Sequence, residues 1–199
     1  MIDKDIYIIE LIEKYEKLLL RNNNSYKYVL GLSILMIKPE SRIIKFEDIA
    51  DKVVEIYFRN IFKYNLIEHN KNQQTKVQQD MKTYFDTYGY KNHLSDIDKE
   101  NLINLIVKNK NNGFFKYVLP CFTGAKKNDK GQYIYPLIGE NEYFYYDLNK
   151  EVIVLSHEYI YIINQKYTLL KNITIEKYAQ YLEKRNPKNK DIRKILSHY

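Results

Sequence analysis

The chain has 199 residues, of which 45% are hydrophobic, 29% are charged and one is a cysteine. This is the composition of an ordinary globular protein, and it excludes collagen-like, low-complexity and disulfide-rich architectures. The formal net charge of +7 and the pI near 9.1 favour an acidic partner such as nucleic acid over an acidic protein or a membrane surface. The sequence contains no signal-peptide core and no apolar run of about 18 residues, so we expect a cytoplasmic protein without a membrane partner.

Helices are predicted throughout the first half of the chain. Apolar residues recur three or four apart over residues 3–21, 25–38, 46–66 and 70–88, and again from Ser95 to about residue 110. Gly89 and the Asn111-Asn112-Gly113 stretch are typical helix stops. Five helices are therefore expected within residues 1–112.

Residues 25–66 have the order helix, tight turn, short extended piece and helix, which is typical of a helix-turn-helix-like module. Ser25 is a candidate N-cap, and Pro39 stops the first helix near Lys38. The second helix is expected to bury one apolar stripe, formed by Phe46, Ile49, Ala50, Val53, Val54, Tyr57, Ile61 and Phe62. Such modules usually dock on nucleic acid, and the outer face of this helix offers the cations Lys52, Arg59 and Lys63.

The second half is predicted to be mixed. The runs 143–146 and 151–155 flank Asp147-Leu148-Asn149-Lys150, a good turn sequence, and predict a β-hairpin. Strands are expected only between about 114 and 155, apart from a possible short piece at 42–45. Ser156 can cap a helix to about residue 166 and Thr174 another to about residue 185, before a last basic helix. The expected fold is mainly α with a small β element (α+β), as one compact unit of a helical subdomain, 1–112, and a mixed subdomain, 113–199.

No catalytic constellation is evident in the sequence. Neither a Walker loop nor a GxGxxG motif is present, and Asp80-Met81-Lys82, the one element resembling a PD-(D/E)xK site, lies on a predicted helix rather than a strand. The histidines are too scattered for an HNH-type site, and Cys121 alone provides no zinc knuckle. Acidic residues around the hairpin are candidates for a divalent ion but are more simply solvated charges: Glu140, Glu142, Asp147 and Glu151. We therefore expect no cofactor, no metal and no catalytic residue in this chain.

The strongest electrostatic feature is a run of six cations in eleven residues, opposed by the single acid Asp191. The six are Lys184, Arg185, Lys188, Lys190, Arg193 and Lys194. Lysine and arginine attract phosphate without base specificity. A polar loop carrying Lys126, Lys127 and Lys130 can extend the same footprint. The alternative interpretation of this run is a solvated C-terminal tail.

Several segments in order resemble the N-terminal region of bacterial HNH endonuclease proteins associated with restriction and phage defence. The resemblance covers roughly residues 25–196, and its segments are SYKYVLGLSILMI, IIKFEDIADKVVEIYF, FFKYVLPCF and the stretch from YFYYDLNKEVIVL to YLEKRNP. In that group a Phe-Leu-Pro-like apolar element precedes a hairpin, a helix and an ending in Arg-Asn-Pro, which here corresponds to Tyr181–Pro187. The resemblance implies a helper domain that positions a nuclease by gripping DNA or a partner. The HNH catalytic unit itself has no counterpart in these residues.

Three functions remain open from the sequence. The first is a DNA-binding, nuclease-associated module, whose partners would be DNA and an HNH nuclease chain or domain. The second is a protein-interaction subunit that binds no nucleic acid, since tyrosine, present 21 times, is enriched at interfaces. The third is an unrecognised metal-dependent nuclease. Salt-dependent retention on DNA separates the first from the second, and metal-dependent cleavage identifies the third.

Overall fold

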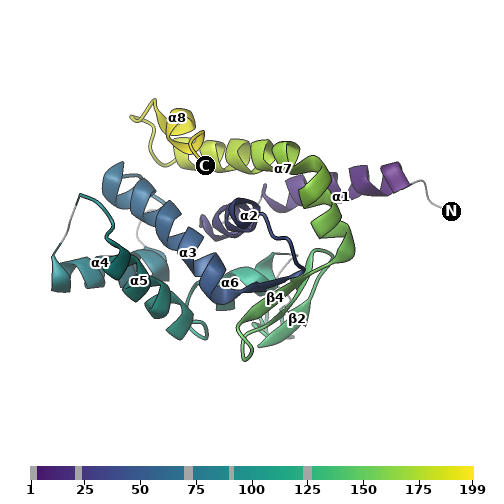
Figure 1. Cartoon of the computed structure of the whole chain (residues 1–199), viewed down its shortest axis with the longest axis horizontal. Helices are drawn as coiled ribbons and strands as arrows, with labels where there is room; N and C mark the ends of the chain where they lie inside the picture. The colour runs from purple at the N-terminus through teal and green to yellow at the C-terminus, as the bar shows by residue number, and fades with distance from the viewer. Residues whose placement is uncertain (1–3, 21–23, 70–73, 90–91, 123–126) are drawn as a thin grey trace.

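The computed structural model describes residues 4–20, 24–69, 74–89, 92–122 and 127–199 (Figure 1). The helices are α1 (Lys4–Leu18), α2 (Tyr26–Ile37), α3 (Phe46–Tyr57), the π-helix η1 (Phe58–Lys63), α4 (Lys76–Tyr88), α5 (Asp96–Lys108), α6 (Phe114–Cys121), α7 (His157–Glu183) and α8 (Ile192–Leu196). The strands are β1 (Ile43–Lys45), β2 (Ile138–Glu140), β3 (Phe144–Asp147) and β4 (Val152–Leu155). The predicted class, mainly α with a small β element, is confirmed.

Helix α2 lies at the centre of the fold, seen end-on in Figure 1 with α3 and α7 on either side. Between Tyr26 and Leu35, every residue of α2 except Lys27 is buried. A helix that is apolar on all sides is stable only when other elements cover it. Contacts from α3, α6 and α7 provide that cover, so the core is built around α2.

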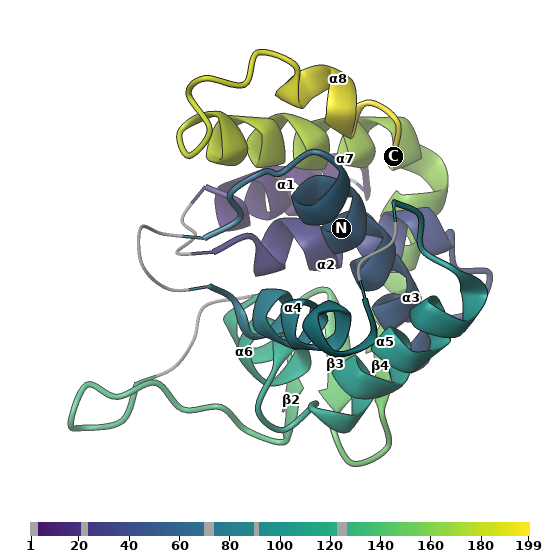
Figure 2. The same cartoon turned by 90° about the vertical axis from the view of Figure 1, so that its left-hand side faces the viewer.

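The four strands form one antiparallel sheet in the order β1-β4-β3-β2. Ile153 of β4 is opposite Ile44 of β1 on one side and Tyr146 of β3 on the other, and all three side chains are buried. Because β1 comes from the first half of the chain, the sheet joins both predicted subdomains. Figure 2 shows the segment before β2, residues 127–137, projecting from the sheet at the opposite end of the molecule from α8. We call it the projecting segment.

Local signals in the sequence set several element boundaries correctly. The hydroxyls of Ser95 and Ser156 accept hydrogen bonds from the third residue of their helices, as N-caps do. Gly89 ends α4 with a φ of +87°, a conformation that costs glycine little. In the hairpin turn, Asp147 Oδ1 accepts from the backbone N–H groups of Asn149 and Lys150 at 2.9 and 3.2 Å.

Other local predictions hold only in part. Ser25 is the N-cap residue of α2, as predicted, but its side chain makes no cap hydrogen bond; its hydroxyl lies 2.7 Å from that of Tyr57. The dense apolar run 114–121 is helix α6, because such a run has no periodicity that separates helix from strand. Helix α7 has a kink at Lys166, where φ is −127° and ψ is 26°, so the first helix expected after β4 ends near residue 166 as predicted, whereas the second begins directly after the kink rather than at Thr174.

The largest difference from the predicted pattern lies at the end of α3. There the chain passes into the π-helix η1, whose hydrogen bonds reach one residue further than those of an α-helix. Within η1, Phe58 and Asn60 are buried, whereas Ile61 and Phe62 are only partly buried. The stripe predicted from α-helical spacing therefore fails after Tyr57.

Candidate nucleic-acid interface

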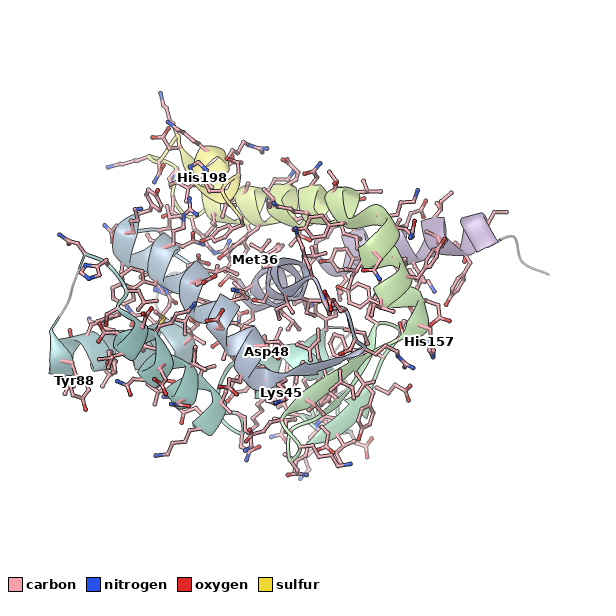
Figure 3. The ribbon with its side chains drawn as sticks, in the orientation of Figure 1. Met36, Lys45, Asp48, Tyr88, His157 and His198 are labelled. Carbon is pink, nitrogen blue, oxygen red and sulfur yellow. The ribbon has the colours of Figure 1, made fainter. Side chains whose placement is uncertain are left out.

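A hollow of about 760 Å³ lies between the segment that follows η1 and the loop from α7 to α8. Tyr64, Asn65 and Ile67 line one side of it, and residues 185–191 line the other. A second hollow of about 260 Å³ adjoins the first, shares Tyr64, Asn189 and Asp191 with it, and continues to Lys194 and His198. We call the two hollows together the groove. Figure 3 shows His198 beside α8, at the end of the molecule away from the sheet.

The side chain of Asn186 holds the two sides of the groove together. Its Oδ1 accepts from the backbone N–H of Ile67 at 2.7 Å, and its Nδ2 donates to the carbonyl of Ile67 at 3.1 Å and to that of Leu182 at 2.9 Å. These bonds satisfy the backbone of Ile67 much as a neighbouring strand would. The two sides of the groove are therefore fixed relative to each other, although they lie more than 100 residues apart in the sequence.

Arg185 is held in place at one side of the groove. Its guanidinium lies 3.6 Å from the centre of the Tyr181 ring and donates to the Tyr181 carbonyl at 3.1 Å. The pKa of His69 is lowered by burial and also by the positive charge of Arg185. The neutral form of His69 is therefore favoured, and Arg185 provides the permanent charge in this region.

A buried polar network lies behind the groove. Glu68 is fully buried and accepts hydrogen bonds from the hydroxyl of Tyr178 at 2.6 Å and from Asn60 Nδ2 at 2.8 Å. The hydroxyl of Tyr199 donates to Asn60 Oδ1 at 3.0 Å. The hydroxyl of Tyr181 donates to the Glu68 carbonyl at 3.0 Å. The network fastens η1, the segment after it, α7 and Tyr199 to one another.

Tyr64 lines both hollows, and two cations lie near its ring. The guanidinium of Arg59 is 5.7 Å from the ring centre and the ammonium of Lys63 is 5.6 Å from it. Arg59 also lies 5.0 Å from the ring of Tyr199. These separations are within the range of cation–π attraction. Arg59 and Lys63, predicted as outer-face residues of a recognition helix, instead stand beside the groove.

The structure divides the predicted C-terminal cations into two groups. Lys188 and Lys190 line the larger hollow with Arg185, and Lys194 lines the smaller one. We call Lys188, Lys190 and Lys194 the rim lysines; all three are exposed. Arg193 points to α7 instead, where it pairs with Glu176 and, at 2.8 Å, with Glu183. Lys184 is exposed at the end of α7 but lies outside the groove lining.

Lys52 does not lie on a free cationic face. Its ammonium is 2.8 Å from Asp51 and 3.4 Å from Glu55, and Lys99 of α5 pairs with the same two acids at 2.5 and 2.8 Å. Helix α5 thus covers this face of α3. The exposed residues at the start of α3, Glu47 and Asp48, are acidic, so α3 is poorly suited to lie against phosphates.

Of the three predicted loop cations, the two that the structure describes are remote from the groove. Lys126 lies outside the described residues. Lys127 and Lys130 are exposed on the projecting segment seen in Figure 2, and the ammonium of Lys127 lies 4.9 Å from the centre of the Tyr133 ring. The positions of Lys127 and Lys130 therefore do not support a single nucleic-acid site that includes both them and the groove.

Three of the four hairpin acids considered for metal binding, and Asp80, have other partners. Glu142 pairs with Lys14 at 3.1 Å, Glu151 pairs with Lys110, and Asp147 caps the hairpin turn. Asp80 pairs with Lys76 and accepts from Asn109 at 2.9 Å. Across the part of the chain that the structure describes, no three His, Cys, Asp or Glu side chains are grouped as a metal site would require.

Comparison with family models, with curated proteins and with solved structures finds no match for this chain. Among the helices described, none is both long and apolar enough to cross a membrane. The groove is therefore the feature from which a function can be inferred. Sequence reasoning did not identify Tyr64, Asn65, Ile67 or His198 as site residues; the only available signal was the position of Tyr64 directly after the basic residue Lys63.

Proposed function

We propose that this chain is a DNA-binding, nuclease-associated module that grips DNA through the groove. The observation that carries the proposal is the convergence of Arg185 and the three rim lysines on a hollow that contains a single acid, Asp191. Cations gathered on one concave surface release condensed counterions when they meet phosphates, which is the main source of sequence-independent affinity for DNA. The net charge of +7 favours the same partner over long distances.

In this proposal, any cleavage belongs to a separate HNH nuclease chain or domain, and the module supplies the grip in a restriction or phage-defence system. Its single cysteine agrees with a reducing compartment, the bacterial cytoplasm. The second candidate function is a protein-interaction subunit. It is favoured by four exposed apolar side chains on and next to the projecting segment, Tyr133, Ile134, Leu137 and Ile138.

The proposal is tested by measuring the affinity for a short fluorescent duplex at salt concentrations from about 50 to 200 mM. We expect log affinity to fall linearly with log salt. Replacing the rim lysines together by alanine should reduce the slope by up to about 2.7, because each neutralised duplex phosphate contributes about 0.9. The matched control replaces the exposed lysines Lys17, Lys82 and Lys108, on α1, α4 and α5, which removes the same charge from positions outside the groove lining.

Arg193→Ala is a second control from within the same basic run. Because its guanidinium already pairs with Glu176 and Glu183, we expect its loss to change the slope much less than the loss of Lys190 does. Equal slopes for the rim-lysine variant and the Lys17/Lys82/Lys108 variant would reject the groove as the contact site. If the unaltered protein shows no salt-dependent binding to any nucleic acid, the proposal fails and the interaction-subunit function takes its place.

A further inference from the structure

The groove combines cations with an aromatic residue. Tyr64 lines both hollows, so a ligand that extends from one to the other passes Tyr64. Ile67, which is 45% exposed, and Pro187 add apolar surface on the two sides of the larger hollow. Nucleobases are flat and have a π-face, so they stack on rings of this kind.

Access to Tyr64 discriminates between paired and unpaired nucleic acid. The hollows, of about 760 and 260 Å³, are open to solvent rather than enclosed, so an unpaired base can approach Tyr64 from outside. A duplex keeps its bases stacked inside two backbones, so its phosphates can touch the rim but its bases cannot reach Tyr64 unless they are extruded. Extrusion costs free energy that a single strand does not have to supply.

The charges are placed to follow a strand that threads the groove. Lys188 and Lys190 border the larger hollow, where Tyr64 contributes its ring, and Lys194 borders the smaller one. Asn65 and Asn189, which also line the larger hollow, carry amide groups that can donate to and accept from base edges. A groove with cations along its edge and an aromatic ring within it is the usual arrangement in proteins that bind single strands.

We infer that the groove accepts unpaired nucleotides, with a base stacked on Tyr64 and the neighbouring phosphates beside the rim lysines. The inference rests on the proposed function and defines its ligand as single-stranded nucleic acid or the unpaired part of a duplex. Stacking provides affinity without base specificity, so the sequence preference should be weak.

The test compares the affinities of one fluorescent oligonucleotide as a single strand and as a blunt duplex. We expect the single strand to bind at least roughly tenfold more tightly, and Tyr64→Ala to weaken single-strand binding by roughly tenfold while duplex binding changes little. Tyr64→Phe keeps the ring and should retain the affinity, whereas Tyr64→Leu keeps the apolar volume but loses the ring and should behave as Tyr64→Ala does. If the Tyr64→Ala variant is unstable, the comparison of Tyr64→Phe with Tyr64→Leu tests the same point.

The control is Tyr88→Ala, because Tyr88 is 70% exposed at the end of α4 and far from α8 in Figure 3. The salt dependence separates this inference from the function on which it rests. If the duplex binds as tightly as the single strand and the Tyr64→Leu variant binds like Tyr64→Phe, the inference is overturned while DNA binding stands. If neither ligand shows salt-dependent binding, the proposed function fails as well.

Discussion

Replacing Glu68 by alanine is expected to destabilise the fold by about 3–4 kcal/mol, the sum of a lost buried hydrogen bond and a cavity. Glu68 is fully buried and its two carboxylate oxygens lie 2.6 and 2.7 Å from the hydroxyl of Tyr178. Without the carboxylate, the Tyr178 hydroxyl proton has lost its acceptor in a site that is closed to solvent. Urea denaturation of both proteins measures the difference.

Glu68→Gln is the matched control, since it keeps the volume and an oxygen that can accept from Tyr178 and Asn60. Burial is the main influence on the Glu68 carboxyl and raises its pKa above the ordinary value of 4.5. A carboxyl whose pKa is higher in the folded state favours folding when it is protonated. That contribution is complete below pH 4.5 and is lost as the pH rises through the folded-state pKa.

Glutamine resembles the protonated acid at every pH, so the stability of Glu68→Gln relative to the unaltered protein should increase as the pH rises above 4.5. Unfolding curves collected across this range provide the test. A difference between the two proteins that stays constant with pH would show that the carboxyl is not held in a desolvated site. Retained stability in Glu68→Ala would show that the network does not fasten the groove.

The signals that predicted elements correctly were local ones. Ser95, Ser156 and Gly89 act on the few residues next to them, so their effect can be read without knowledge of the fold. The hairpin was also predicted from a local signal, namely turn residues between two β-branched or aromatic runs. Helix α6 did not follow, because its apolar residues are too dense to reveal a period.

The π-helix was beyond sequence reasoning because its cause is tertiary. Helical spacing alone places Asn60 on the apolar stripe, three residues after Tyr57, but it does not show that the chain widens into a π-turn there or that Asn60 bonds to Glu68 and Tyr199. A π-turn has poorer local geometry than an α-helix, and three side-chain hydrogen bonds of Asn60, including one to Tyr178 at 3.0 Å, help to offset that cost. The spacing of apolar residues within 46–66 cannot reveal Tyr178 and Tyr199, because both lie more than 100 residues further along the chain.

The candidate site was predicted in part. The basic run identified Arg185 and the rim lysines, because charge density is visible in a linear sequence. What the run could not reveal is that Arg193 is neutralised by α7, or that Tyr64 lies across from Lys190. The first requires α8 to fold back on α7, and the second requires the Ile67 segment to be held beside the loop by Asn186, a contact across 119 residues. The functional distinction between a solvated tail and a groove is therefore a property of the fold.

A steric test of the core concerns Gly31 of α2. A Cβ added at this position would lie 2.5 Å from the hydroxyl oxygen of Tyr15, and that hydroxyl is held at 2.8 Å from Thr174 Oγ1. We expect Gly31→Ala to destabilise the fold by about 1–3 kcal/mol, because overpacking outweighs the gain of about 1 kcal/mol in helix propensity.

Removal of the hydroxyl should reverse the effect of this substitution. Beyond the hydroxyl, the nearest atoms to the added Cβ are Tyr15 Cζ at 3.6 Å and Thr174 Cγ2 at 3.7 Å, which are ordinary contacts. Tyr15→Phe alone should cost about 1 kcal/mol, since Thr174 still donates to the Leu170 carbonyl at 2.7 Å. In that background Gly31→Ala should be neutral or stabilising, which gives a coupling energy of about 2 kcal/mol in a double-mutant cycle. Additive effects in urea denaturation would mean that α1 and α2 do not approach each other as closely as the Tyr15–Gly31 contact requires.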